Sequence, residues 1–561
     1  MLHVSDRIRS VYIVIAIICT VFSLVGCGGG GGDGDNPVAP TPSLPDTPLI
    51  SLKAQDLATP GTSSDNAFNQ GALALRIPTS TKRERYAVLL SNGGMASTVK
   101  INGGGSSRLN SVRSSVAAVA PMTRPVCGTP FLREARKNLS SSAIRANRVA
   151  TMKAMTTDEK LKDVISFSIY AGGVTSLNNT FYTKRNGVLR RIGTYCKIFV
   201  DPEPAPNGLS ATIGTYTIKD TELDTMVKNF DEAIYPLMTG QYGPSYDMDG
   251  DGKVAIFLSP LVTQNGFAGF FDSENLSESP DSNQRDMFCM WTPYWDYKRE
   301  EWLPATCETI AHEFQHLINF STRMKMQKSS LMSNYGGYSE YNRDHGNYWF
   351  DKITEEETWL DEALSMGAEI RYRLSVGDPA TEGRFRNYMY ELSTKPLTSF
   401  SNTLADYGRV GLFSHYLFEK GTASRIKQLV TSGLRGKENI NAAFADHEIK
   451  ELRTFDSIFK NWTKAVFVEM NRENIHDLSV IPAWQRFSED FKLVRSNTTA
   501  LTYGAGAQEY LPEDSLTMFI LKPSNGYTAD SATLYLQAVI GTTQQTSASI
   551  DCTVMRLNDA Q

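Results

Sequence analysis

Apolar positions recur at helical spacing in several segments of the second half of the chain. Around the stretch "AHEFQHLINF", Ile310, Phe314 and Leu317 lie three or four residues apart, which predicts an amphipathic helix partly sunk in a core. The segments "ETWLDEALSMGAEI" (357–370) and "FDSIFKNWTKAVFVEM" (455–470) show the same kind of pattern. We therefore predict three helices, the last of which closes the central region of the chain.

Apolar and polar residues alternate on both sides of this region, as they do in half-buried strands. The stretches "RYAVLLSN" and "STVKING" come before it, "SLTMFILKP" and "SATLYLQAVI" come after it, and Gly/Ser-rich breaks interrupt the first part. The predicted fold class is α+β. We predict a mainly β N-terminal domain, a mixed central domain, a linker and a small C-terminal β module, at residues 51–199, 200–471, 472–497 and 498–561.

The composition is that of an ordinary globular protein. Of the 561 residues, 41% are hydrophobic and 21% are charged, and the length allows several domains. The net charge is −5, and basic residues are interspersed with acidic ones except at residues 133–153, a stretch that we interpret as a solvated helix face. This balance argues against nucleic acid as the main partner. The sequence does not indicate an oligomeric state.

The first 26 residues have the plan of a secretory signal peptide. Two arginines precede an apolar stretch that is too short for a comfortable membrane span. The following "LVGC" resembles the lipobox of bacterial lipoproteins and implies lipid attachment at Cys27, with a plain signal peptide or anchor as the alternative. Residues 27–50 are rich in Gly and then in Pro, which predicts a tether. An aspartate after the lipid-modified cysteine would resemble an inner-membrane retention signal, and this chain has Gly28 at that position. We therefore expect an exported protein that is lipid-anchored to the bacterial outer membrane or cell surface.

Five cysteines remain after Cys19 and Cys27 are set aside. Their spacing is not typical of a metal site, and an odd number leaves at least one thiol free or paired elsewhere. The five are Cys127, Cys196, Cys289, Cys307 and Cys552.

The motif "HEFQH" places reactive groups on the first predicted helix. Residues i and i+4 of a helix share a face, so His312 and His316 converge on one point that suits a zinc ion. Glu313 would lie beside the open position of the metal, where it could take a proton from water. A catalytic zinc usually has three protein ligands. The next predicted helix offers three acidic candidates for the third ligand, which are Asp361, Glu362 and Glu369.

A family resemblance narrows this choice. The motif "HEFQH" followed by "WLDEAxS" resembles the glutamate zincins, and Glu362 with Glu369 resembles the "NEG…E" helix of zinc aminopeptidases. The stretches "CKIFVD", "MVKNFDEAIYP", "DMDGDGKVAIFL", "GFAGFFD" and "NQRDMF" resemble the hyicolysin-like metallopeptidases, over about residues 150–470. The resemblance implies a zincin-like catalytic domain at residues 200–471 with Glu362 as the third zinc ligand. The separation of His316 and Glu362 is longer than is usual in glutamate zincins.

The resemblance also implies a reaction, the hydrolysis of protein or peptide substrates by a zinc endopeptidase. His312, His316 and Glu362 would hold a zinc ion that lowers the pKa of a water, and Glu313 would take the proton of that water and return it to the leaving amine. Tyr407 resembles the tyrosine that precedes a Gly-containing helix in zinc aminopeptidases. It is therefore the implied donor to the oxyanion.

Two alternatives stay open. His415 and Tyr416 lie inside the predicted helix that Tyr407 precedes, and they could be packing residues or the donor. The chain could also be a non-catalytic surface lipoprotein, an adhesin or scaffold, with a vestigial or structural zinc site. The intact Glu313 favours the peptidase, because a structural zinc site has no need of a base.

A second metal is suggested by "DMDGDGKV". Asp247, Asp249 and Asp251 alternate before Gly252, the pattern by which oxygen ligands enclose calcium. Leu258, however, stands where an EF-hand loop has its bidentate glutamate. A calcium site and a plain Asp/Gly-rich turn leading into a strand both remain open.

Overall fold

The computed structural model of the chain combines helices and sheets, as the predicted α+β class requires. The described residues are 48–57, 63–78, 84–102, 126–138, 158–171, 182–204, 217–277, 282–293, 299–335, 349–377, 384–385, 387–388, 391, 395–470, 499–502, 506–522, 531–540 and 543–557. The predicted signal peptide, Cys27, nearly all of the tether and the linker at residues 472–497 lie outside these residues.

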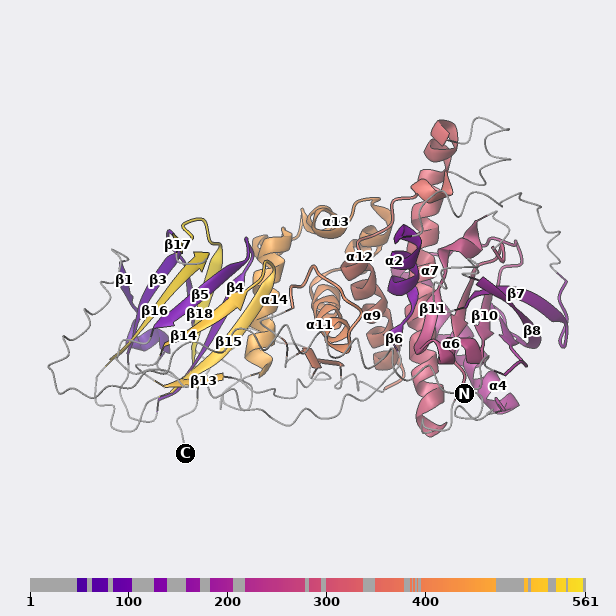
Figure 1. Cartoon of the computed structure of the whole chain (residues 1–561), viewed down its shortest axis with the longest axis horizontal. Coiled ribbons are helices and arrows are strands. Elements are labelled where there is room, and N and C mark those ends of the chain that lie inside the picture. The colour runs from indigo at the N-terminus through magenta and orange to yellow at the C-terminus, as the bar shows by residue number, and fades with distance from the viewer. Residues whose placement is uncertain are drawn as a thin grey trace, which may run out of the picture. The chain divides into compact units, whose positions relative to one another are not determined.

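A seven-stranded mixed sheet forms the centre of the region that carries the HEFQH motif (Figure 1). Strands β9, β10 and β12 run parallel, and β11 is antiparallel to β12. Strands β10, β11 and β12 are continuously apolar and buried, as is typical of strands covered on both faces. In spatial order the sheet consists of β6 (Val126–Cys127), β11 (Phe267–Phe271), β12 (Met287–Met290), β10 (Val254–Leu258), β9 (Cys196–Val200), β8 (Tyr182–Ile192) and β7 (Val164–Tyr170).

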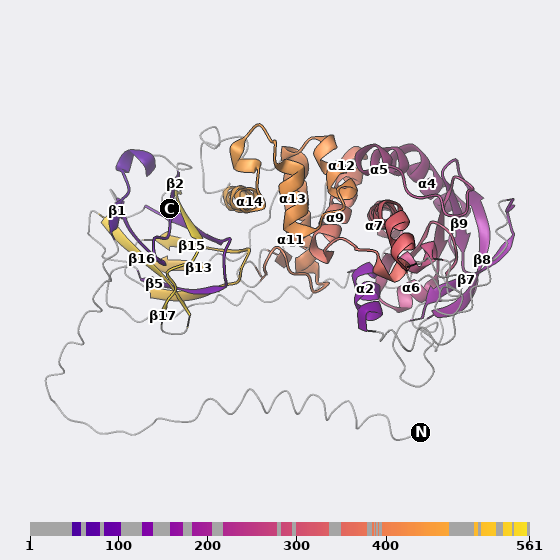
Figure 2. The ribbon, with the colours of Figure 1, turned by 90° about the horizontal axis from the view of Figure 1, so that it is seen from above.

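The HEFQH motif lies on α7 (Arg299–Tyr335), which packs against β11 and β12. Every residue from 310 to 321 is buried, so the predicted apolar face is confirmed and the other sides of the helix are covered as well. The second predicted helix is α9 (Thr358–Ser375), which lies between α7 and α11 (Leu404–Lys420) (Figure 2). Neighbouring helices therefore bring together side chains that are far apart in the sequence.

The remaining helices include the third one predicted, α14. They are α2 (Thr129–Asn138), α4 (Asp220–Asn229), the π-helical turn Phe230–Ile234, α5 (Tyr235–Tyr242), α6 (Pro260–Gln264), α12 (Ala423–Thr431), α13 (Gly436–Phe444) and α14 (Phe455–Met470), with 3₁₀ turns at Ala54–Leu57, Ser273–Leu276, Phe350–Lys352 and Lys450–Leu452. Among the described helices, none has both the length and the apolar composition needed to cross a membrane.

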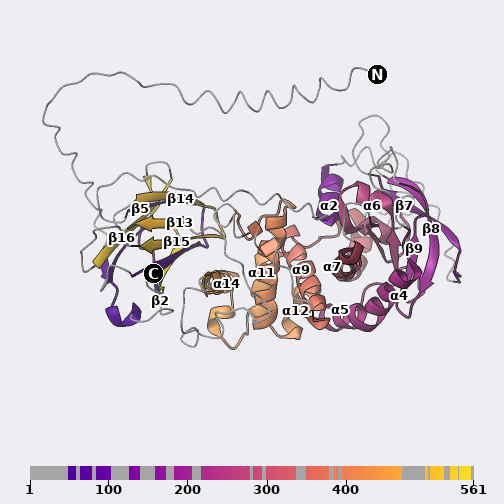
Figure 3. The same cartoon turned by 90° about the horizontal axis from the view of Figure 1, so that it is seen from below.

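Strands from both ends of the chain form two further sheets that share one apolar core (Figure 3). The first sheet consists of β1 (Leu49–Ser51), β3 (Ala72–Pro78), β16 (Ser531–Ile540), β5 (Ser97–Asn102) and β14 (Gly506–Leu511), with β17 (Thr543–Gln544) paired to β16. The second consists of β13 (Thr499–Thr502), β15 (Ser515–Lys522), β4 (Tyr86–Asn92), β18 (Ile550–Arg556) and β2 (Ser63–Ala67). Together they form a β-sandwich.

This pairing differs from the predicted division into a β domain at residues 51–199 and a separate β module at residues 498–561. Strand β16 is hydrogen-bonded to both β3 and β5, and β15 is hydrogen-bonded to β4, so the two segments build one sandwich. Strands β6 to β9, predicted as part of the N-terminal domain, belong to the central sheet. The strands themselves were predictable, but alternation along a strand does not identify its partner.

Candidate metal centre

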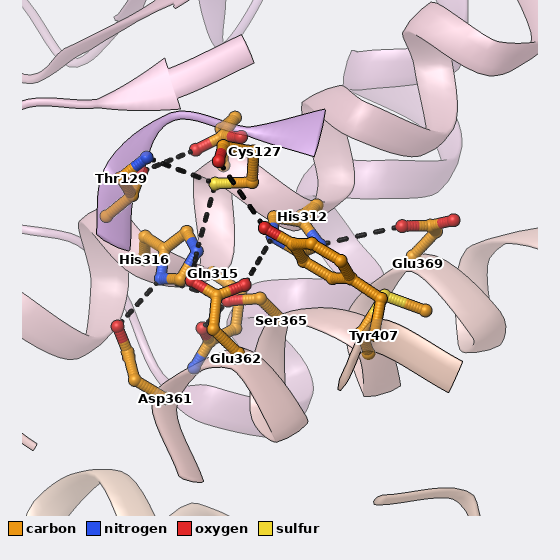
Figure 4. A network of polar contacts seen from close by, with 12 residues as sticks. Cys127, Thr129, His312, Gln315, His316, Asp361, Glu362, Ser365, Glu369 and Tyr407 are labelled. Atoms are coloured by element: carbon orange, nitrogen blue, oxygen red, sulfur yellow. Dashed lines mark hydrogen bonds and ion pairs between the residues drawn. The ribbon is translucent and has the colours of Figure 1, made fainter. Parts of the chain in front are cut away.

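The two histidines of α7 face a glutamate from α9 (Figure 4). The Nε2 atom of His312 lies 3.3 Å from Oε2 of Glu362, and the Nε2 atom of His316 lies 3.2 Å from Oε1 of the same carboxylate. All three side chains are buried. The four-residue spacing of the histidines places both rings on one helix face, with their centroids 5.0 Å apart. The structure thus brings together the three residues expected to bind zinc.

A fourth side chain, which the sequence did not point to, completes the group. The thiol of Cys127, at the end of β6, lies 3.7 Å from Nε2 of His316. One ligand atom from each of Cys127, His312, His316 and Glu362 can be chosen so that all four lie within 4.8 Å of one another. We call these four residues the zinc cluster, after the ion that the sequence predicts for three of them.

The zinc cluster contains buried polar atoms whose bonding capacity is unused. Both carboxylate oxygens of Glu362 and Nε2 of His312 have no hydrogen-bond partner among the described residues. Burying a carboxylate in this way is costly unless a cation or donor compensates it. Imidazole nitrogen, carboxylate oxygen and thiolate sulfur are all ligands that zinc accepts. The residues of the cluster therefore fit a zinc ion.

A second acidic residue of α9 orients His316 from behind. Oδ2 of Asp361 lies 2.9 Å from Nδ1 of His316, the ring nitrogen that faces away from the cluster, and 2.6 Å from Nη2 of Arg133. Burial alone would raise the pKa of the Asp361 carboxyl, but Arg133 and His316 outweigh it and hold this pKa below its ordinary value. An ionised Asp361 fixes the tautomer and orientation of His316. From the sequence, Asp361 was one candidate for the third zinc ligand. The structure instead places it behind His316, on the side away from the cluster.

Glu369, the other acidic residue left open, lies in the same way behind His312. Its Oε2 atom is 3.5 Å from Nδ1 of His312, and its Oε1 atom is 2.6 Å from Nη1 of Arg384. Burial opposes ionisation of Glu369, but Arg384 and His312 lower the pKa of this carboxyl to about 2. Each histidine therefore has its own carboxylate on the side away from the zinc cluster.

Glu313 lies beside the cluster and is fully buried. Its Oε2 atom accepts hydrogen bonds from the backbone N–H of Phe271 at 2.9 Å and from the hydroxyl of Thr129 at 3.1 Å. Its Oε1 atom has no hydrogen-bond partner among the described residues. Burial raises the pKa of the Glu313 carboxyl, which the charges of His312 and His316 oppose only in part. A carboxylate with a raised pKa is suited to accept a proton and release it again.

Tyr407, on α11, also reaches the cluster. Its ring centroid lies 6.2 Å from that of His312. Its single hydroxyl hydrogen is shared between Oδ1 of Asn402, at 2.5 Å, and the backbone oxygen of Cys127, at 3.4 Å. His415, the alternative on the same helix, has its Nε2 atom 3.2 Å from Glu419 and is not part of the cluster.

The three aspartates of "DMDGDGKV" also lie close together. One carboxylate oxygen from each of Asp247, Asp249 and Asp251 is within 4.8 Å of the others. The two oxygens of Asp247 accept the backbone N–H groups of Gly250 at 2.8 Å and Gly252 at 3.1 Å. Both glycines have positive φ angles, 75° and 72°, as a tight turn before β10 requires. These observations show the tight turn that both predicted alternatives require, and we call the three residues the aspartate turn.

Two histidines one helical turn apart, a glutamate from the next helix and a second glutamate at their side define a candidate zinc hydrolase centre. The chain is similar to the neutral metalloprotease ShpI of Staphylococcus hyicus, with 27% identity over 216 residues, which are 36% of this chain and 42% of the relative. The chain thus spans less than half the length of that relative. No family model matches the chain. The similarity supports a relationship to metalloproteases, as the sequence had implied.

Proposed function

We propose that the chain is a hyicolysin-like zinc endopeptidase that hydrolyses extracellular proteins and is anchored through a lipid on Cys27 to the outer membrane or cell surface. The observation that carries the proposal is the buried Glu362 carboxylate, which faces two histidines and has no hydrogen-bond partner among the described residues. Glu313 beside it supplies the group that distinguishes a hydrolytic centre from a metal-binding one. The similarity to a neutral metalloprotease supports the same interpretation.

The roles of the residues follow from their positions. His312, His316 and Glu362 would hold a zinc ion, which supplies Lewis-acid polarisation and lowers the pKa of a water when it is bound. Glu313 accepts a proton from the attacking water and transfers it to the leaving amine, for which its free Oε1 atom is available. The hydroxyl of Tyr407 already donates to a backbone carbonyl, and it would donate in the same way to the substrate oxygen that becomes negative.

The second candidate function, a non-catalytic surface lipoprotein, is favoured by one observation. A structural zinc site normally has four protein ligands, whereas a catalytic site keeps one position open. Cys127 would make a fourth protein ligand. Glu313 has no role in a structural site, and for this reason we place the peptidase first.

The base is tested by Glu313→Gln, with Glu300→Gln, an exposed change on the same helix, as its matched control. We expect Glu313→Gln to retain zinc and to lower the rate of casein digestion by about 10²–10⁴-fold, because general base catalysis is lost and the ligands are kept. Metal content is measured on the same samples, in the wild-type and Cys127→Ala backgrounds. If the chain with Glu313 intact binds zinc but is inactive both with Cys127 and with Cys127→Ala, the conclusion moves to the scaffold role. Full activity of Glu313→Gln would refute Glu313 as the base.

The anchor is tested with the full-length chain in bacterial cells. The wild-type chain is expected in the membrane fraction with a lipid label, and Cys27→Ala is expected to lose both. An unchanged distribution and label would refute the lipid anchor without affecting the peptidase.

A further inference from the structure

Cys127 lies against the zinc cluster, in which the proposed function requires one ligand position to stay open for water. Its sulfur lies 3.7 Å from Nε2 of His316, and the backbone N–H of Thr129 donates to the same sulfur at 3.4 Å. Among the described cysteines, Cys127 alone lies in a group of metal-ligating residues. A thiolate is a strong zinc ligand, so it would compete with water for the fourth position.

The backbone around Cys127 fills one edge of the central sheet. Among the described strands, β6 is the last one of the central sheet and is hydrogen-bonded to β11 alone, with Cys127 paired to Gly269. The N–H of Gly128 donates to the backbone oxygen of Gly269 at 2.8 Å. A Cβ atom at Gly128 would lie 2.7 Å from the ring of Phe267, so this close approach requires glycine. Peptides often bind by adding a strand to a free sheet edge, and here the edge of β11 is filled by the chain itself.

The polar groups assigned to catalysis contact the same short segment. The backbone oxygen of Cys127 accepts from Tyr407 at 3.4 Å and from Nδ2 of Asn402 at 3.3 Å. The hydroxyl of Thr129 donates to Glu313 at 3.1 Å. The proposed oxyanion donor thus binds a carbonyl of the chain, and the proposed base binds a hydroxyl two residues further on.

Two arginines of α2 attach β6 and α2 to neighbouring elements through ion pairs. Arg133 forms ion pairs with Asp361 at 2.6 Å and with Glu355 at 2.5 Å. Arg136 pairs with Asp272 and donates to the hydroxyl of Tyr182 at 3.0 Å. Arg133 has only 10% of its side chain exposed, so the pair with the buried Asp361 is shielded from solvent.

We infer that residues 126–138 form an inhibitory segment, in which Cys127 is the fourth zinc ligand and β6 blocks the position of the substrate strand. The inference rests on the proposed function for its inhibitory part, whereas the ligand assignment stands without it. The intact chain is then latent, and it becomes active when the segment leaves the zinc cluster. The four-ligand arrangement that suggested a structural site is, on this inference, the resting state of an enzyme.

The ligand assignment is tested on the full zinc-loaded chain by X-ray absorption at the zinc edge. The wild type should show one sulfur neighbour at about 2.3 Å, and Cys127→Ala should show none. Cys552→Ala, which removes a buried cysteine of the β-sandwich, serves as the matched control and should keep the sulfur. Casein digestion by the same samples should rise at least about tenfold in Cys127→Ala alone, because the competent state is no longer a minor one.

The two proposals fail in different ways. A wild-type zinc ion without a sulfur neighbour overturns the inference, whatever the activity. Sulfur that is lost in Cys127→Ala without a gain in activity, both in that variant and in its combination with Arg136→Ala, overturns the inhibitory role. The Glu313→Gln comparison then decides separately whether the wild type is a peptidase.

A second variant leaves the zinc cluster untouched, in case Cys127→Ala does not fold. Arg136→Ala removes the contacts with Asp272 and Tyr182 and should raise the rate at which a thiol reagent labels Cys127, located by peptide mass. Arg190→Ala, which removes an ion pair with Asp220 elsewhere, is its control. Equal labelling rates in the two variants and the wild type would contradict a segment held by α2.

Discussion

The described part of the chain contains two groups of side chains that could bind a metal, and they differ in what their ligand atoms already do. In the zinc cluster, neither oxygen of Glu362 has a hydrogen-bond partner among the described residues. In the aspartate turn, both oxygens of Asp247 accept backbone N–H groups, and Oδ1 of Asp251 accepts the N–H of Lys253 at 2.7 Å. The first group has bonding capacity left for a cation, whereas in the second group only Oδ1 of Asp249 is buried without a hydrogen-bond partner among the described residues.

Charge gives the same contrast. The Nζ atom of Lys197 lies 2.5 Å from Asp251, and Nε of Arg285 lies 3.6 Å from Asp249, so the chain supplies cations to its own aspartates. The inner face of the zinc cluster receives no lysine or arginine among the ion pairs of the described residues, and the arginines nearby bind the outer carboxylates. From this difference we expect unused ligand atoms to identify a metal site better than the number of acidic residues does.

The largest effect is expected from Glu362→Gln. The change keeps the shape of the side chain and removes the charge that faces both histidines. Zinc affinity should fall by more than about 100-fold, which exceeds the loss typical of changes behind a ligand. Competition with a chromogenic chelator measures it. Asp251→Asn, the matching change in the aspartate turn, should leave zinc affinity as it is, and equal losses in the two variants would break the comparison.

A smaller effect is expected from Asp361→Asn, which leaves the zinc cluster intact and alters only the support of His316. We expect zinc affinity to fall by about 10–100-fold, since an amide holds the imidazole less firmly in the required tautomer. Glu355→Gln is the control, because it removes the other ion-pair partner of Arg133 and leaves Asp361 in place. If Glu355→Gln weakened zinc binding as much as Asp361→Asn does, the loss of affinity would come from the ion pairs of Arg133 and not from the contact of Asp361 with His316.

The local part of this site could be predicted from the sequence. The spacing of His312 and His316 fixes their common face, and the apolar pattern around them identifies α7 as a buried helix. The choice between Asp361 and Glu362 could not be made from the pattern alone. Consecutive residues of a helix point about 100° apart, so either could face the histidines until the packing of α9 on α7 is known.

The contacts between distant parts of the chain could not be predicted from the sequence. Cys127 precedes His316 by 189 positions, and no spacing rule connects the two. The β-sandwich gives the same lesson, since β16 and β5 are strands predicted from the sequence whose pairing joins distant parts of the chain. Spacing within one element predicts a face, whereas contacts between elements depend on how the whole chain folds.

The smallest effect is expected at the aspartate turn, where burial raises the pKa of Asp249 from 3.8 to about 6. The folded state therefore binds this proton more tightly than the unfolded state, and the stabilisation it gives is lost as the pH rises from about 4 through 6. Asp249→Asn resembles the protonated form, so its melting temperature should match the wild type near pH 4 and exceed it modestly at pH 7. Calcium at millimolar concentration should leave both melting temperatures unchanged. If calcium raised the wild-type melting temperature at pH 7 and not that of Asp249→Asn, the aspartates would be a calcium site and unused ligand atoms would be too strict a criterion.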